Sequence, residues 1–175
     1  RKGHAFPVVE PSLYVPKSED FSKTANNLIS YPVPDMMNPD LARLLAYIIA
    51  EGWVAQHNTF TITQYRDKNP ETRKDIDDLL KSQFGYPVTK DDPEGGTIHS
   101  RFIRHYLERM GVEYTVSADK LILPVILQSS RESIVNFVRA FMDAEGFVSG
   151  QDLCVSSASE RLLRELQVLL LHLGI

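Results

Sequence analysis

The sequence predicts an α+β fold made of two tandem, pseudo-symmetric modules with the element order αββαββα, the second of them incomplete. Two observations support this fold class. Apolar residues recur at helical spacing in some segments and alternate with polar residues in others. In addition, one nine-residue segment occurs twice along the chain. The 175 residues, 43% of them hydrophobic and 24% charged, have the composition of a globular protein.

The chain divides into three regions. Residues 1–37 contain five of the ten prolines and are expected to form strands and a linker. Residues 38–128 are predicted to form the first module and residues 129–175 the second. Since the second module is predicted to consist of a helix, one strand and a second helix, we expect two further strands, a basic residue and a helix beyond Ile175.

The first module is predicted to begin with a helix. Asn38 and Pro39 are a favourable helix cap and first residue, and Gly52 is expected to end the helix in a left-handed conformation. The pattern that follows predicts a hairpin over 53–64, a helix over 70–84, strands over 86–90 and 97–99, and a helix that Ser100 caps and Gly111 ends.

In the second module, Ser129 and Glu132 have the spacing of a capping box before a helix that ends at Gly146. A strand is predicted over 153–155, where Cys154 is expected to be a buried, inert thiol, and Ser159 caps a leucine-rich helix up to Gly174.

The repeated segment is the strongest signal in the sequence. Ala46–Val54 aligns with Ala140–Val148, and five of the nine positions are identical. Alanines four residues apart give each helix a face of small side chains, which allows two such helices to pack closely. We therefore expect the two helices to lie against each other.

Each copy places a glutamate, Glu51 or Glu145, in the last helical position before a glycine. A carboxylate there is unfavourable by about 0.3–1 kcal/mol, because carbonyl groups already concentrate negative charge at that end. The same unfavourable placement of a carboxylate in both copies indicates a functional site. Two adjacent carboxylates would suit Mg²⁺, which can activate water for phosphodiester hydrolysis. Alternatively, the repeat only packs two helices and its glutamates are solvated surface charges.

These segments, Leu44–Gly52 and Val138–Gly146, resemble the two motifs of the LAGLIDADG homing endonuclease family. The resemblance covers about residues 31–175 and implies two curved antiparallel sheets that straddle double-stranded DNA. It also implies that the motif helices form the interface between the halves. By resemblance, Glu51 and Glu145, with the adjoining Gly52 and Gly146, hold Mg²⁺ or Mn²⁺ at the scissile phosphates. Both motifs end in Glu where the family more commonly has Asp.

Lys120–Pro124 resembles the Lys-x-Ile-Pro block of intein-borne members, with one extra residue. The resemblance implies that Lys120 assists catalysis, where it could stabilise developing negative charge. The alternative is an exposed lysine at a strand end. The same block implies an intein, with a covalently linked protein-splicing domain outside this chain.

DNA contacts are predicted on the polar face of the first sheet, since polar side chains can contact base edges and cations can contact phosphates. Threonine alternation is equally typical of ordinary strands. The predicted contact residues are Thr59, Thr61, Thr63, Gln64, Arg66, Lys68, Lys90, His99 and Arg101.

The net charge of −4 and the isoelectric point of about 5.7 exclude general attraction to polyanions, so DNA binding must depend on local arrangement. No apolar run approaches the roughly 20 residues of a membrane span, and we expect a cytoplasmic protein without a membrane partner. Two alternatives to a site-specific DNA endonuclease stay open. One is a catalytically degenerate DNA- or RNA-binding module, such as a maturase or an inactive intein domain, and the other is a structural domain without a nucleic-acid partner.

Overall fold

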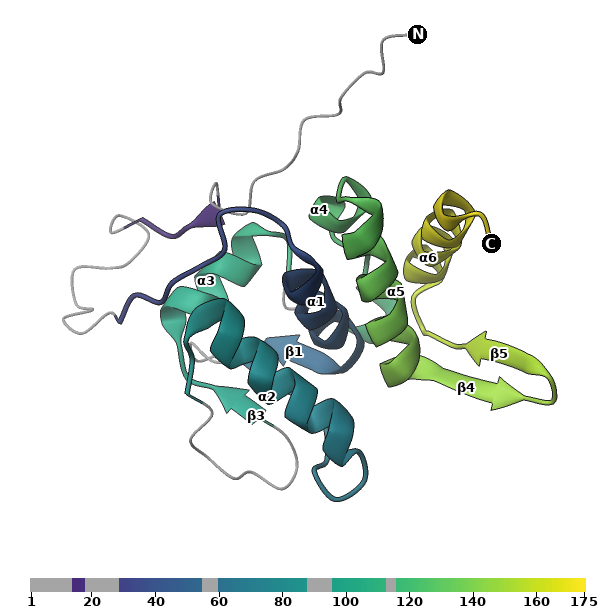
Figure 1. Cartoon of the computed structure of the whole chain (residues 1–175), viewed down its shortest axis with the longest axis horizontal. Coiled ribbons are helices and arrows are strands. Elements are labelled where there is room, and N and C mark those ends of the chain that lie inside the picture. The colour runs from purple at the N-terminus through teal and green to yellow at the C-terminus, as the bar shows by residue number, and fades with distance from the viewer. Residues whose placement is uncertain (1–13, 18–28, 55–59, 88–95, 113–115) are drawn as a thin grey trace, which may run out of the picture.

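The computed structural model describes residues 14–17, 29–54, 60–87, 96–112 and 116–175. Helices and short antiparallel strands alternate along this part of the chain, which confirms the α+β class (Figure 1). The elements are α1 (Pro39–Glu51), β1 (Gly52–Val54), β2 (Phe60–Ile62), α2 (Pro70–Phe84), β3 (Gly96–Ile98), α3 (Arg101–Arg109), a 3₁₀ turn (Ser117–Asp119), α4 (Pro124–Leu127), α5 (Arg131–Glu145), β4 (Gly146–Ser149), β5 (Asp152–Val155) and α6 (Glu160–Leu173).

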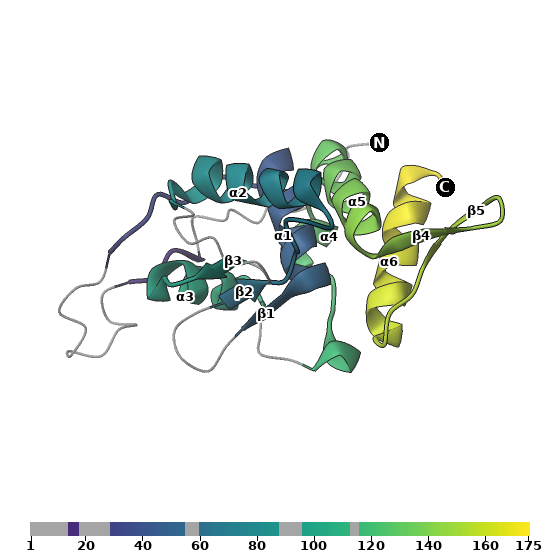
Figure 2. The same cartoon turned by 90° about the horizontal axis from the view of Figure 1, so that it is seen from below.

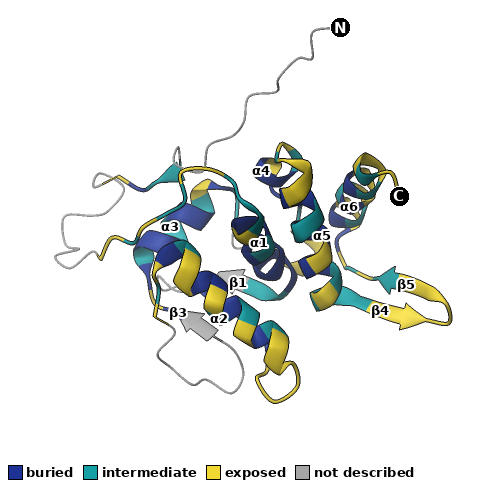
Figure 3. Ribbon diagram, viewed as in Figure 1, coloured by how far each residue is buried: buried dark blue, intermediate teal, exposed yellow. Residues whose placement is uncertain are grey.

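Helix α1 begins where the sequence predicts. The side chain of Asn38 accepts a hydrogen bond from the backbone N–H of Leu41 at 2.8 Å, and Pro39 occupies the first turn. Nearly every residue after the first turn is buried, which makes α1 the central helix of the described structure (Figure 3). Its end leads directly into β1.

A three-stranded antiparallel sheet with the order β1-β2-β3 follows α1. Gly52 pairs with Ile62 and Trp53 with Thr61, so the predicted hairpin over 53–64 forms, with residues 55–59 outside the described part. Phe60 pairs with Ile98 on the other side of β2. Figure 2 shows helix α2 on one side of this sheet, beside α1.

In the second half, α5 leads directly into the β4-β5 hairpin, in which Gly146 pairs with Val155. Helix α6 follows, and the side chain of Ser159 caps it by accepting from the N–H of Leu162 at 3.1 Å. The hairpin extends away from the helices, as Figures 1 and 2 both show. Both halves thus share the order helix, strand, strand, helix, whereas a division into two complete pseudo-symmetric modules stays a prediction.

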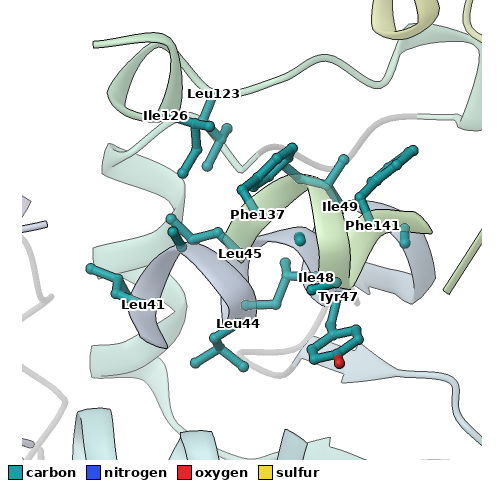
Figure 4. Packing of buried hydrophobic residues seen from close by; sticks show 14 of the residues in the cluster. Leu41, Leu44, Leu45, Tyr47, Ile48, Ile49, Leu123, Ile126, Phe137 and Phe141 are labelled. Carbon is teal, nitrogen blue, oxygen red and sulfur yellow. The ribbon is translucent and has the colours of Figure 1, made fainter. Parts of the chain in front are cut away.

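The most extensive packing between two elements is that of α1 against α5, which confirms that the repeated helices lie together. Ala46 and Ala140 are almost fully buried, and such small side chains allow close approach. Figure 4 shows the apolar side chains around this pair, among them Leu45 and Ile49 from α1 with Phe137 and Phe141 from α5.

Four details differ from the sequence-based predictions. Ser130 rather than Ser129 caps α5, because its side chain accepts from the N–H of Ser133 at 3.2 Å, while the Ser129 hydroxyl donates to the carbonyl of Val125. Residues 124–127 form a short helix that was not expected. Of the predicted strand over 86–90, residues 86–87 are irregular and the rest lies outside the described part. Cys154 is half-buried, because the protruding hairpin leaves it at the surface of the core.

Within the described ranges, none of the helices combines the length and apolar character needed to cross a membrane.

Candidate active site at the paired helix ends

The two motif helices end in the same way. Glu51 is the last residue of α1 and Glu145 the last of α5, and both are half-buried. The glycines that follow have nearly the same backbone conformation, with φ −87° and ψ 151° at Gly52 and φ −79° and ψ 151° at Gly146. Each glycine also starts the strand that leaves the helix. The two carboxylates therefore occupy equivalent positions on the two packed helices.

This geometry corrects the expected role of the glycine that ends each helix. Gly52 and Gly146 do not adopt the left-handed conformation predicted for Gly52. Instead, a Cβ atom at Gly52 would overlap the carbonyl oxygen of Ile48, and one at Gly146 would overlap that of Met142. Glycine is thus required by a close backbone approach, in which the helix turns into a strand without an intervening loop.

The two carboxylates affect each other electrostatically. Burial raises the pKa of Glu51 above its usual value, repulsion from Glu145 raises that pKa further, and attraction to Lys120 opposes both effects. This mutual effect agrees with the geometry, since α1 and α5 pack together and each ends at one of the two acids. The paired helix ends therefore bring together the two acids that the sequence predicts as partners.

Lys120 completes this cluster. Its Nζ donates a hydrogen bond to the carbonyl oxygen of Ala50 at 2.7 Å. That carbonyl belongs to the last turn of α1, where carbonyl groups have no partner within the helix and attract cations. Burial lowers the pKa of Lys120, while the charges of Glu145 and Glu51 counteract that shift. The lysine lies half-buried beside the acids and is not an exposed strand-end residue.

The donor set fits a hard divalent cation with few protein ligands. Two carboxylates are anionic oxygen donors, and burial makes their mutual repulsion unfavourable unless a cation neutralises it. No group of three or more His, Cys, Asp or Glu side chains suited to a metal occurs among the residues that the structure describes. An ion held here would thus keep most of its coordination for water and substrate oxygens, as Mg²⁺ does. The metal-binding role of Gly52 and Gly146 stays a prediction.

The predicted DNA-contact residues on the strands fall into different environments. Thr59 and Lys90 lie outside the described residues. Thr61 and Thr63 are half-buried, and the backbone N–H of Thr63 donates to the carbonyl of Glu51 at 3.0 Å. This bond joins the strand that carries the threonines to the end of α1.

Gln64 is placed differently from the expectation. It is buried, and its amide oxygen accepts a hydrogen bond from Asn69 at 2.7 Å. The guanidinium of Arg73, also buried, donates to the backbone carbonyl of Gln64 at 3.4 Å and to Asp77 at 3.0 Å. These contacts fix the connection between β2 and α2, so Gln64 supports the loop and does not present a free amide to a ligand.

The remaining predicted contact residues lie nearer the surface. Arg66 is exposed and pairs with Asp77 at 3.1 Å, while the ammonium of Lys68 lies 4.6 Å from the ring centroid of Tyr65. His99 is exposed, and Arg101 is the half-buried first residue of α3. Their contact with DNA stays a prediction.

Sequence reasoning missed two residues beside the cluster. Ser159 is predicted only as a helix cap, yet its hydroxyl also donates to the carbonyl of Lys120 at 2.6 Å. Glu165, on the same helix, accepts from the backbone N–H of Ile122 at 2.7 Å. Neither contact has a local sequence signature, because the partners are 39 and 43 residues apart.

The fold is α+β and carries equivalent acids at the ends of two packed helices, and a comparison with known families finds a match to part of the chain. Residues 132–175 match the model of the LAGLIDADG-like domain. This segment includes the second motif with Glu145, so the match supports the predicted resemblance to LAGLIDADG proteins over these residues. The family comprises homing endonucleases and related DNA-binding modules.

Among curated proteins, the chain is similar to the Replication factor C small subunit of Methanocaldococcus jannaschii. The two are 24% identical over 141 residues, a stretch that covers 79% of this chain and 8% of the relative. The chain thus corresponds to only a small part of the relative's length.

Proposed function

We propose that this chain is the nuclease portion of a site-specific double-strand DNA endonuclease that hydrolyses phosphodiester bonds. The observation that carries the proposal is the convergence of Glu51, Glu145 and Lys120 at the ends of two packed helices. Two half-buried acids that repel each other lower the stability of the fold. Arrangements of this kind are typically retained at functional sites.

Each residue has a separate role in the proposed reaction. Glu51 and Glu145 would hold Mg²⁺ or Mn²⁺, which when bound supplies an activated water and stabilises the leaving oxygen. Their equivalent positions on two packed helices suit a substrate with two strands, one acid serving each strand. Lys120 supplies positive charge beside the acids, where negative charge develops on the phosphate during hydrolysis.

Sequence recognition would depend on the polar residues of the first sheet and its flanking loops. Arg66, Lys68, His99 and Arg101 offer cationic or hydrogen-bonding groups for phosphates and bases. With a net charge of −4, the chain requires such local contacts. We further propose that the two halves form pseudo-symmetric modules.

The wider context proposed is an intein with a linked protein-splicing domain, located in the cytoplasm. The motifs and the Lys120–Pro124 block support this context. A match to 8% of the length of a protein named for another function is also what an enzyme embedded in a host protein would give.

A second candidate is a catalytically degenerate DNA- or RNA-binding module. One observation favours it: the Lys120 ammonium already compensates part of the charge of the two acids and bonds to Ala50, so the cluster is partly neutralised without a metal. The two candidates differ in whether the acids are required for cleavage.

The test uses a plasmid library with randomised duplex inserts, incubated with the full chain in Mg²⁺. The first candidate predicts linear product from a subset of inserts. Glu51→Gln and Glu145→Gln should abolish cutting of those inserts while leaving binding in Ca²⁺ intact, and Glu160→Gln, an exposed change on α6, should cut at the parental rate. If the parental protein binds inserts without cutting them, the second candidate holds. Cutting at the parental rate by both motif variants would remove the catalytic assignment.

A further inference from the structure

The backbone around Lys120 is held by helix α6, which belongs to the second half of the chain. Ser159 is fully buried, and its hydroxyl donates to the carbonyl oxygen of Lys120 at 2.6 Å while accepting from the N–H of Leu162 at 3.1 Å. One side chain therefore caps α6 and fixes the lysine backbone at the same time. A cap alone would require only the acceptor function of the hydroxyl.

Glu165 supplies a second attachment one and a half turns further along α6. Its Oε2 accepts from the backbone N–H of Ile122 at 2.7 Å, and its Oε1 accepts from Arg161 at 2.9 Å. Hydrogen bonds to an ionised acceptor are shorter and stronger than neutral ones. Ile122 is buried as well, so the segment after Lys120 is fixed by both packing and hydrogen bonding.

The side chain of Lys120 then points from this fixed backbone to the end of α1, where it meets the carbonyl of Ala50. A lysine side chain has many rotamers, and ordering it is entropically unfavourable. Anchoring its backbone at two points reduces the number of positions that the ammonium can reach. Two hydrogen bonds from α6 therefore hold the backbone from which this positive charge extends to the end of α1.

We propose that Ser159 and Glu165 are positioning residues for Lys120, so that the second half of the chain places a charge required at the site formed by both motif helices. This inference rests on the proposed nuclease function for its catalytic consequence, but the placement of Lys120 can be measured without any cleavage. Helix α6 would then hold the backbone of Lys120 in addition to packing against the core.

The deciding variants separate the two functions of the Ser159 hydroxyl. Ser159→Asp keeps a good helix cap but cannot donate to the carbonyl of Lys120, because a carboxylate only accepts. Ser159→Thr keeps both functions. Glu165→Ala removes the acceptor for Ile122, whereas Glu165→Gln retains an acceptor oxygen. Glu160→Gln, on the exposed face of α6, is the control.

The first readout is the rate at which an acylating reagent modifies Lys120, followed by mass spectrometry and compared with that of the exposed Lys74 in the same sample. We expect Ser159→Asp and Glu165→Ala each to raise the relative rate at Lys120 by roughly fivefold, the effect of losing about one hydrogen bond. Ser159→Thr, Glu165→Gln and Glu160→Gln should match the parental protein. An unchanged rate in both Ser159→Asp and Glu165→Ala, with parental melting temperatures, would overturn the proposal.

The second readout is cleavage. Ser159→Asp and Glu165→Ala should lower kcat with unchanged affinity for the DNA insert, and the Thr and Gln variants should restore it. A loss of DNA affinity with unchanged kcat would contradict a role at the reacting phosphate. If no protein in the series cuts DNA, the proposed nuclease function fails, and the acylation rates still decide whether α6 positions Lys120.

Discussion

Gly52 and Gly146 turn the two motif helices directly into strands with backbone conformations that differ by only a few degrees, φ −87° and ψ 151° against φ −79° and ψ 151°. Because each glutamate is the residue before its glycine, this shared turn fixes both carboxylates at equivalent places on the packed pair. The two glycines therefore allow both acids to take equivalent positions at the helix ends.

Replacing either glycine with alanine should destabilise the protein by about 2–3 kcal/mol, the magnitude of an overpacked site. The added Cβ would overlap the carbonyl oxygen of Ile48 in Gly52→Ala or of Met142 in Gly146→Ala, and backbone cannot move aside as a flexible side chain does. Urea denaturation measures the change. Gly150→Ala is the comparison, since its Cβ would meet nothing within 4 Å and only its φ of +67° is unfavourable. A smaller loss in Gly52→Ala than in Gly150→Ala would contradict this explanation.

Glu51→Gln should stabilise the metal-free protein at neutral pH. Burial and the charge of Glu145 raise the pKa of Glu51 in the folded state above the unfolded value near 4.5. A raised folded pKa means that the wild-type protein is relatively most stable below the unfolded value and loses stability as pH rises through the folded value. The glutamine variant lacks this loss, so melting temperatures in chelator should diverge above about pH 4.5. Parallel pH profiles for the two proteins would contradict a raised pKa of Glu51 in the folded protein.

Lys68→Ala should reduce the salt dependence of DNA binding. Each phosphate contact contributes about 0.9 to the slope of log affinity against log salt, and one contact fewer lowers that slope by about one. Fluorescence anisotropy in Ca²⁺ over a series of salt concentrations measures it. Lys74→Ala is the matched control, because that lysine is exposed on α2 and pairs with Asp78. Equal slopes in the two variants would remove Lys68 from the predicted interface.

The helices and their packing could be predicted because their signals are local. The cap at Asn38, the alanine spacing and the duplicated Glu-Gly pair are all read within a few residues, and they correctly predict that α1 and α5 lie together. Local signals also mislead when either of two adjacent residues could cap the helix. Ser129 and Ser130 both precede an apolar run, and the backbone selects Ser130 since Ser129 instead bonds back to α4.

The chemistry around the acids was only partly predictable, because it depends on contacts between distant segments. Lys120 and Ala50 are 70 residues apart, and no periodicity indicates that they touch. Gln64 illustrates the reverse case. It was predicted as an outward DNA contact, although the alternation places it on the same face as the buried Phe60 and Ile62. Asn69 donates to its amide oxygen, and the buried Arg73 donates to its backbone carbonyl. A buried polar side chain of this kind needs hydrogen-bond partners, and these partners come from outside the strand.

The most direct test of the central claim is a crystal structure of the chain grown with Mn²⁺ and measured for anomalous scattering. The shared site predicts an anomalous peak that contacts carboxylate oxygens of both Glu51 and Glu145, and its loss in crystals of Glu145→Gln. A structure with Mn²⁺ bound elsewhere, or with the two carboxylates turned apart and no peak between them, would contradict the proposal that these helix ends form one metal site.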